Sequence, residues 1–292
     1  MHRLLLTPSH TRAQQAELSP SLWRPQKLAA QVEGGHQACV APTMPWCKPA
    51  GDEPASFRGT TLVLPCVSIG SVPQLGVDLL VQAPQLHFRR VAFLDASDCV
   101  PFVSPAEPGS GDAFCTALDV YQSPLGITAV QQRSPVIRSQ KEHFAKQLAA
   151  WIQDAQFAQV LVLTSMDAAL RTDKELPLTF VSLRPRARDV PSDAPLVHRV
   201  STAFPAFAPP HTPEDAVPPV PGGGVTRILL EHLPANSVAL AMFCAEGENR
   251  PDAHALIGQV GKLLQLPLAE PLAEPPSWRT VYGEGPNPML YG

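Results

Sequence analysis

The sequence predicts an α/β fold in which helices cover both faces of a largely parallel sheet, giving one three-layer α/β/α domain. Short apolar runs rich in β-branched residues alternate with segments whose apolar residues recur at helical spacing. Several of these runs are apolar throughout, as expected for parallel strands that are covered on both faces. Alternating strands and helices are typical of this class.

Proline content divides the chain into segments. With 34 prolines in 292 residues, the chain holds about twice the usual share of roughly 5%. Residues 1–56 contain seven prolines and no sustained period, so a disordered leader is expected there. The single domain is assigned to 57–285, with a proline-rich insertion at 185–221 that holds ten prolines. Residues 286–292 form a C-terminal tail.

A strand, a helix and a second strand are expected to begin the domain. The apolar run at 61–70 predicts the first strand, and a helix follows in which Val72, Leu75 and Leu79 share one face. Ser71 is the expected N-cap. The run RRVAFLDA indicates a second buried strand, so these elements are expected to form a parallel unit.

A strand pair, a helix and a further strand are expected next. Residues 117–133 indicate two strands joined by a turn at Ser123–Gly126, where proline and glycine favour a chain reversal. Ser139 and Glu142 have capping-box spacing at the start of a helix. The apolar face of this helix contains Phe144, Leu148, Trp151, Ile152 and Ala155, and the run QVLVLTS after it predicts a buried strand.

Helix, strand and helix complete the domain beyond the insertion. Helical spacing of apolar residues predicts one helix at 221–233 and a closing helix at 251–266. The uninterrupted apolar run at 237–245 between them predicts a strand.

Charge and composition argue against several functional classes. The formal net charge is −4 and the chain has no Lys/Arg run, so the sequence indicates no basic surface that would bind the phosphates of nucleic acid. The longest apolar stretch, Val238–Ala245, is too short to span a membrane. The six cysteines form no C-x-x-C pair and the nine histidines form no H-E-x-x-H motif, so no metal site is expected. The cysteines are expected to be reduced thiols of an intracellular protein.

Three groups of residues are candidates for chemistry, and each has a structural alternative. Gly222–Gly224 precede a helix, where glycines can bind phosphate, but without P-loop spacing they fit a flexible turn better. Glu246, Glu248 and Asp252 lie between a strand and a helix, and either act as acid and base or complement the helix dipole. Ser165 lacks the flanking glycines of a nucleophile elbow, so a strand-end cap is expected. These patterns predict no catalytic residue and no cofactor.

The C-terminus, NPMLYG, places a tyrosine next to the last residue. Terminal residues are usually polar and poorly ordered unless a contact holds them. Pro286 and Pro288 would lower the entropy lost if this tail entered a groove. These residues alone leave both a frayed end and a binding tail open.

Four stretches together resemble the proteasome assembly chaperone 2 family, in that family's order and at roughly its spacing. Ser71 and Pro73 depart from the pattern, where Asn and Gly are expected, and residues 185–219 cannot be aligned with it. The four stretches are LPCVSIGSVPQLGVDLL at 64–80, PGGGVTR at 221–227, AEGENRPDA at 245–253 and PSWRTVYGEG at 276–285.

This resemblance implies a non-enzymatic chaperone of the cytoplasm and nucleus, with a nucleoside-phosphorylase-like core. It implies pairing with proteasome assembly chaperone 1 and binding to the outer face of the 20S proteasome α-ring, which promotes correct ring assembly. The family's hydrophobic-Tyr-X tail enters pockets between α subunits, and Leu290, Tyr291 and Gly292 match that pattern. The competing hypothesis is a phosphorylase-like enzyme that acts on a nucleoside or a phosphorylated small molecule through the glycine run and the acids near Glu246.

Overall fold

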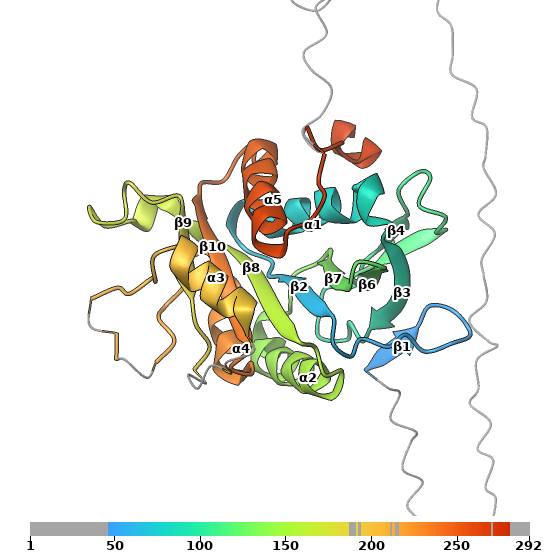
Figure 1. Cartoon of the computed structure of the whole chain (residues 1–292), viewed down its shortest axis with the longest axis horizontal. Helices are drawn as coiled ribbons and strands as arrows, with labels where there is room; N and C mark the ends of the chain where they lie inside the picture. The colour runs from blue at the N-terminus through green and yellow to red at the C-terminus, as the bar shows by residue number, and fades with distance from the viewer. Residues whose placement is uncertain are drawn as a thin grey trace, which may run out of the picture. The chain divides into compact units, whose positions relative to one another are not determined.

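Figure 1 shows the computed structural model of the chain, which describes residues 46–186, 191, 194–210, 212–213, 216–269 and 271–280. In this part of the chain the main sheet has eight strands, in the order β1-β3-β6-β7-β2-β8-β10-β9. The strands are β1 (Cys47–Pro49), β2 (Thr61–Pro65), β3 (Arg89–Leu94), β6 (Leu118–Ser123), β7 (Ile127–Gln132), β8 (Gln159–Asp167), β9 (Phe180–Leu183) and β10 (Ser237–Cys244).

The sheet is parallel at its centre and antiparallel on both sides. Strand β2 pairs in parallel with β7 and β8, and β8 pairs in parallel with β10. The succession β1-β3-β6-β7 is antiparallel, as is the pairing of β9 with β10. The predicted α/β class is confirmed, whereas the nucleoside-phosphorylase-like detail stays a prediction.

Helices cover both faces of this sheet and give it three layers. Helices α1 (Val72–Gln82), α3 (Pro195–Ala203) and α5 (Arg250–Leu264) pack on one face. Helices α2 (Lys141–Asp154) and α4 (Thr226–His232) pack on the other. Helices α1 and α5 are neighbours in Figure 1, and a Cβ on Gly76 of α1 would lie 3.2 Å from the Ile257 side chain of α5. This glycine therefore permits their close packing.

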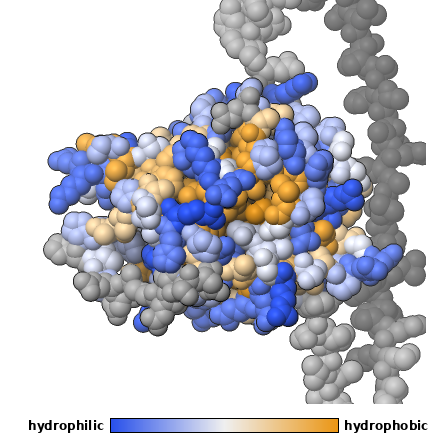
Figure 2. Space-filling model, viewed as in Figure 1, coloured by the Kyte–Doolittle hydropathy of each residue, from blue (hydrophilic) through white to orange (hydrophobic). Residues whose placement is uncertain are grey.

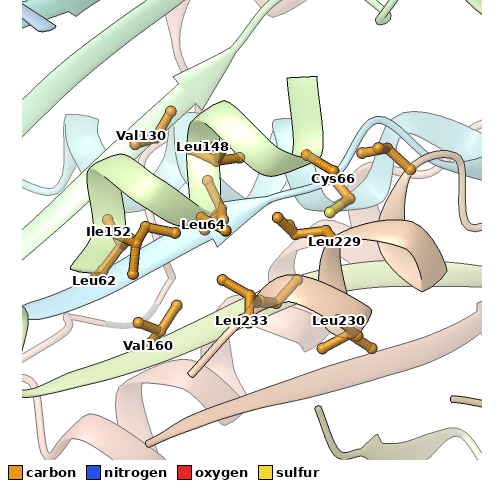
Figure 3. Packing of buried hydrophobic residues seen from close by; sticks show 14 of the residues in the cluster. Leu62, Leu64, Cys66, Val130, Leu148, Ile152, Val160, Leu229, Leu230 and Leu233 are labelled. Carbon is orange, nitrogen blue, oxygen red and sulfur yellow. The ribbon is translucent and has the colours of Figure 1, made fainter. Parts of the chain in front are cut away.

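Strand β2 contributes to the apolar clusters on both faces, because successive side chains of a strand point to opposite sides. Figure 3 shows Leu62 and Leu64 of β2 beside Leu148 and Ile152 of α2 in one cluster. Val63, which lies between the two leucines, belongs to the cluster under α1 and α5. All three strand residues are fully buried or nearly so, which explains why β2 reads as a continuous apolar run.

The predicted parallel unit β2-α1-β3 is right in element types but wrong in the position of its second strand. β3 runs in the same direction as β2, yet β7 and β6 lie between them. Only Ala92 and Leu94 of β3 are buried, because this strand lies next to the edge strand β1. An apolar run therefore does not by itself distinguish a central strand from one near the edge.

The helix starts differ from the predicted caps. The N-cap of α2 is Gln140, and no side chain caps it, because Arg138–Gln140 form a 3-10 turn that leads into the helix. The capping box of Ser139 and Glu142 is therefore absent. Ser71 does occupy the N-cap of α1, but its side chain makes no capping hydrogen bond, and its φ of 53° is left-handed.

Two regions predicted to lack regular structure contain elements. Strand β1 lies inside the segment assigned to the leader, residues 1–56, and pairs with β3. Helix α3 lies inside the proline-rich insertion 185–221, where Pro195 stands in its first turn. Proline is tolerated there because the amide it lacks would have no partner inside the helix. Strand β9 and the small hairpin of β4 (Val103–Pro105) and β5 (Phe114–Thr116) were also not predicted.

Candidate functional site

The carboxyl ends of the parallel strands, where α/β folds usually bind ligands, are closed by their own loops. The loop after β2 and the glycine run are joined because the Ile69 N–H donates to the Gly222 carbonyl at 2.8 Å. The Asp167 N–H, at the end of β8, donates to the Pro221 carbonyl at 3.0 Å. Three segments far apart in sequence thus share backbone hydrogen bonds at this edge of the sheet.

The glycine run allows this close contact between loops. Gly224 has a φ of +64°, and a Cβ there would lie 1.9 Å from the Val67 carbonyl oxygen. A Cβ on Gly222 would lie 3.0 Å from the Ile69 side chain. The turn interpretation of these glycines is therefore the better one.

Ser165 is fully buried within the same network and not poised as a nucleophile. Its hydroxyl donates to the Ile69 carbonyl at 2.5 Å and lies 2.7 Å from the Ser68 hydroxyl. Its N–H donates to Ser68 Oγ at 3.0 Å. A nucleophilic serine needs a general base within reach, and these hydroxyl contacts include neither a histidine nor a carboxylate. Ser165 joins the end of β8 to the loop after β2.

The acidic residues after β10 organise the start of α5. Glu248 Oε1 accepts from the Arg250 N–H at 3.1 Å and from Arg250 Nε at 2.9 Å. The hydrogen bond from the Arg250 side chain lowers the pKa of Glu248. Burial, followed by the charge of Glu248, raises the pKa of Asp252 in the first turn of α5. Glu246 is exposed. These contacts fit the helix-start interpretation.

A charged pair that the sequence did not suggest joins buried Asp78 of α1 to Arg133, which directly follows β7 and whose side chain is 22% exposed. Arg133 approaches Asp78 with both terminal nitrogens, at 2.7 and 2.9 Å, and Gln131 donates to the same carboxylate at 2.5 Å. Burial raises the pKa of Asp78, and the charge of Arg133 opposes that rise. The group lines a polar cavity of about 160 Å³ together with Arg90 and Tyr121. In the sequence, Asp78 stands within an apolar helix pattern that gives no sign of its partner.

Exposed apolar side chains gather around the β4–β5 hairpin. We call Val100, Val103, Phe114 and Ile137 the hairpin surface; their exposed fractions are 46%, 75%, 44% and 39%. Two of them, Val103 and Phe114, line an apolar hollow of about 490 Å³ together with Phe93. The rings of Phe93 and Phe114 stack with centroids 6.2 Å apart. Contiguous exposed apolar residues are typical of protein-binding surfaces.

A second apolar region lies on the face formed by α1 and α5. Figure 2 shows orange side chains gathered in the middle of this face among hydrophilic ones. A groove of about 620 Å³ runs beside α5, with His254 and Lys262 as its charged or titratable residues. Its apolar lining includes Leu266, Leu268 and Leu272.

The predicted binding residues Leu290, Tyr291 and Gly292 lie outside the described residues. Among the described residues, no cluster of His, Cys, Asp and Glu has the composition of a metal site. In the same part of the chain, no helix has the length and apolar character that a membrane crossing requires.

Comparison with known proteins relates the chain to one family. Residues 62–273 match the model of the PAC2 family. The chain is 32% identical over 262 residues to the protein named proteasome assembly chaperone 2 of Danio rerio, covering 83% of this chain and 98% of that protein. It is 26% identical over 265 residues to the Homo sapiens protein of the same name, covering 83% and 99%.

Solved structures share the fold at much lower identity. Pyrococcus furiosus PbaA, described as an archaeal homolog of proteasome-assembly chaperone, has a TM-score of 0.54 at 15% identity, with 75% of this chain and 88% of PbaA covered. PbaB from the same organism, described as an archaeal proteasome activator, has a TM-score of 0.51 at 12% identity, with 77% and 92% covered. At such identities the likeness shows the fold alone.

Proposed function

The chain belongs to the PAC2 family, whose model matches residues 62–273, and on this basis we propose that it is a proteasome assembly chaperone. The observation that carries the proposal is the match to relatives named proteasome assembly chaperone 2 over 98% and 99% of their length. The family expected from the four sequence stretches is thereby confirmed.

The proposed partner is a second folded chaperone, proteasome assembly chaperone 1, bound as a heterodimer. The hairpin surface supports this proposal, because Val103 and Phe114 expose large apolar side chains beside an apolar hollow. Neighbouring β1 is a poor template for an added strand, since it has three residues and ends in Pro49. A partner that packs side chains onto the hairpin surface fits better than one that extends the sheet.

The second proposed contact is with α subunits of the 20S proteasome, at the outer face of their ring. Leu290 would supply apolar burial and Tyr291 a large ring with a hydroxyl group, while the Gly292 carboxylate would pair with a cation of the pocket. A short tail binds weakly alone, but connection to a folded domain that makes its own contact raises the overall affinity. In this proposal the chaperone acts in the cytoplasm and nucleus.

The alternative, an enzyme with phosphorylase-like chemistry, has less support. The close approach of the Val67 carbonyl accounts for the glycine at position 224, and Ser165 contacts no base through its hydroxyl. We therefore propose a non-enzymatic role. Thermal unfolding with phosphate, nucleosides and nucleotides tests it, because a ligand at a hundred times its Kd stabilises the folded state by about 2.7 kcal/mol. A specific stabilisation of that size would favour the enzyme.

Co-purification from cells tests the chaperone proposal. Tagged full-length chain is compared with a chain that lacks Leu290, Tyr291 and Gly292. We expect both to recover a second α/β chaperone, and only the full-length chain to recover α subunits well. Recovery of neither partner by either chain would refute the proposed function, while equal recovery of α subunits would refute the role of the tail.

A further inference from the structure

The last described turn, Pro276–Thr280, is attached to the domain through a buried tryptophan. Trp278 is 3% exposed and belongs to the apolar cluster under α1, α3 and α5. Its ring packs edge-on against the imidazole of His254 in α5, with the centroids 6.4 Å apart. A tryptophan side chain buries up to roughly 250 Å², so this contact holds the turn firmly against the helical layer.

Two polar contacts hold the residues around Trp278. Glu274 Oε1 lies 3.2 Å from His254 Nε2, and its Oε2 lies 3.4 Å from Arg250 Nη1, so this carboxylate binds α5. Ser277 donates with its hydroxyl to Glu107, in the loop between β4 and β5. The Ser277 N–H donates to the same carboxylate at 3.3 Å. The turn is thus attached both to a helix and to the hairpin.

These contacts show that the folded domain extends beyond the end of α5 and includes Trp278. The described residues between Leu264 and Pro276 contain no helix or strand, but Leu266, Leu268 and Leu272 pack against the cluster under α5. Without the Trp278 contact, the segment after Leu272 is therefore free to separate from the domain. Twelve residues lead from Trp278 to Leu290, against 18 from Leu272.

We propose that Trp278 is the positioning anchor of the C-terminal tail, with Glu274 and Ser277 as its polar supports. This inference rests on the proposed function of the tail. Effective concentration falls roughly as the −3/2 power of linker length, so lengthening the connection from 12 to 18 residues lowers the tail's contribution to affinity about twofold. The last turn that the structure describes, Pro276–Thr280, lies beside α5 and the β4–β5 loop.

The first measurement is independent of any partner. Arg279 is exposed and follows the anchor directly, so trypsin cleavage after Arg279 reports whether the turn is held. We expect Trp278→Ala to accelerate this cleavage at least threefold, and Trp278→Phe, which keeps an aromatic ring, to restore most of the protection. Glu107→Ala removes the acceptor of Ser277 without opening the core and should accelerate cleavage to a smaller extent.

The second measurement is the Kd for purified 20S proteasome, with each variant made in the full-length chain and in one lacking residues 290–292. Trp278→Ala should weaken binding about twofold in the full-length chain and have no effect in the shortened chain. Trp151→Ala is the matched control, because Trp151 is buried in the cluster on the opposite face of the sheet. It should leave both the cleavage rate and the Kd unchanged.

An unchanged rate of cleavage after Arg279 in Trp278→Ala would contradict the proposal that Trp278 anchors this turn. An equal acceleration in Trp151→Ala would contradict it as well. A Kd unaffected by Trp278→Ala, or weakened equally in the shortened chain, would overturn its action through the tail. If the full-length and shortened wild-type chains bind 20S proteasome equally, the proposed role of the tail fails, and with it this role of Trp278.

Discussion

Gly224 and Asp78 are single residues whose identity depends on partners distant in sequence. Gly224 must approach the Val67 carbonyl more closely than any side chain permits. Asp78 is buried, and its charge is held by Arg133 and Gln131 from the neighbouring strand β7 and its end. A buried ion pair adds little net stability, but removal of one partner leaves an uncompensated charge.

Gly224→Ala is expected to lower the free energy of unfolding by about 2–3 kcal/mol, because the methyl group clashes with backbone at a left-handed φ. Urea unfolding measures the change. Gly258→Ala in α5 is the control: a Cβ there meets no atom within 4 Å, so alanine should stabilise the helix by up to about 1 kcal/mol. A loss at Gly224 no larger than about 0.5 kcal/mol would contradict the close contact of the loops.

Arg133→Met is expected to lower the free energy of unfolding by about 3–5 kcal/mol at neutral pH, because Asp78 stays buried without its counter-charge. Arg133 opposes the burial that raises the pKa of Asp78, so its removal raises that pKa further. The folded variant then binds a proton that the unfolded chain releases near pH 4. The destabilisation should therefore be small at low pH and increase as pH rises through the variant's Asp78 pKa.

Urea unfolding of wild type and Arg133→Met at about pH 5 and pH 7.5 tests whether the destabilisation increases with pH. The double variant Asp78→Asn, Arg133→Met removes the buried charge and should recover part of the lost stability at the higher pH. A destabilisation that is equal at both pH values, with no recovery in the double variant, would show that Arg133 acts through packing alone.

At the scale of elements, several short segments owe their structure to packing. Helix α3 has nine residues, and isolated helices of that length are marginal in water. Leu196, Val197 and Val200 are fully buried against the sheet and hold the helix in place. Strands β4 and β5 have three residues each, and they present Val103 and Phe114 to the exterior. The hairpin is therefore the element we expect a partner to contact.

Val103→Glu is expected to weaken binding to proteasome assembly chaperone 1 at least tenfold, or about 1.4 kcal/mol, because it places a charge in an apolar contact. The free energy of unfolding should change by less than about 0.5 kcal/mol, since Val103 is 75% exposed. Titration calorimetry measures the Kd. The control Leu125→Glu lies in the turn after β6, is 50% exposed and should bind normally. Equal Kd values for both variants would locate the partner elsewhere.

At the scale of the whole domain, the sheet separates two apolar clusters and its centre is the most protected region. Strands β2, β8 and β10 have neighbours on both sides and are almost entirely buried. Strand β1 lies at one edge with three partly exposed residues, and β9 lies at the other. Local opening should therefore begin at the edges, where the fewest contacts must break.

Hydrogen exchange is expected to be slowest in β8 and β10 and to reach the rate of global unfolding there. Amides of β1 should exchange at least about a hundredfold faster, corresponding to an opening that costs some 2.7 kcal/mol less. Mass spectrometry of peptides from each strand measures this order. Protection of β1 equal to that of β8 would contradict an edge position for β1.

The sequence by itself determined the α/β class, the main strands and helices, and membership of the family, because each depends on local periodicity or on motifs that stay contiguous in the chain. The tertiary structure alone decided the order of strands, the positions of β1 and α3, the partner of Asp78 and the exposure of the hairpin surface. Each of these depends on contacts between residues far apart in sequence: Val67 with Gly224, Asp78 with Arg133, Glu107 with Ser277. The sequence does not show whether an apolar residue such as Val103 lies in a core or on a binding surface, and only its packing in the tertiary structure distinguishes the two.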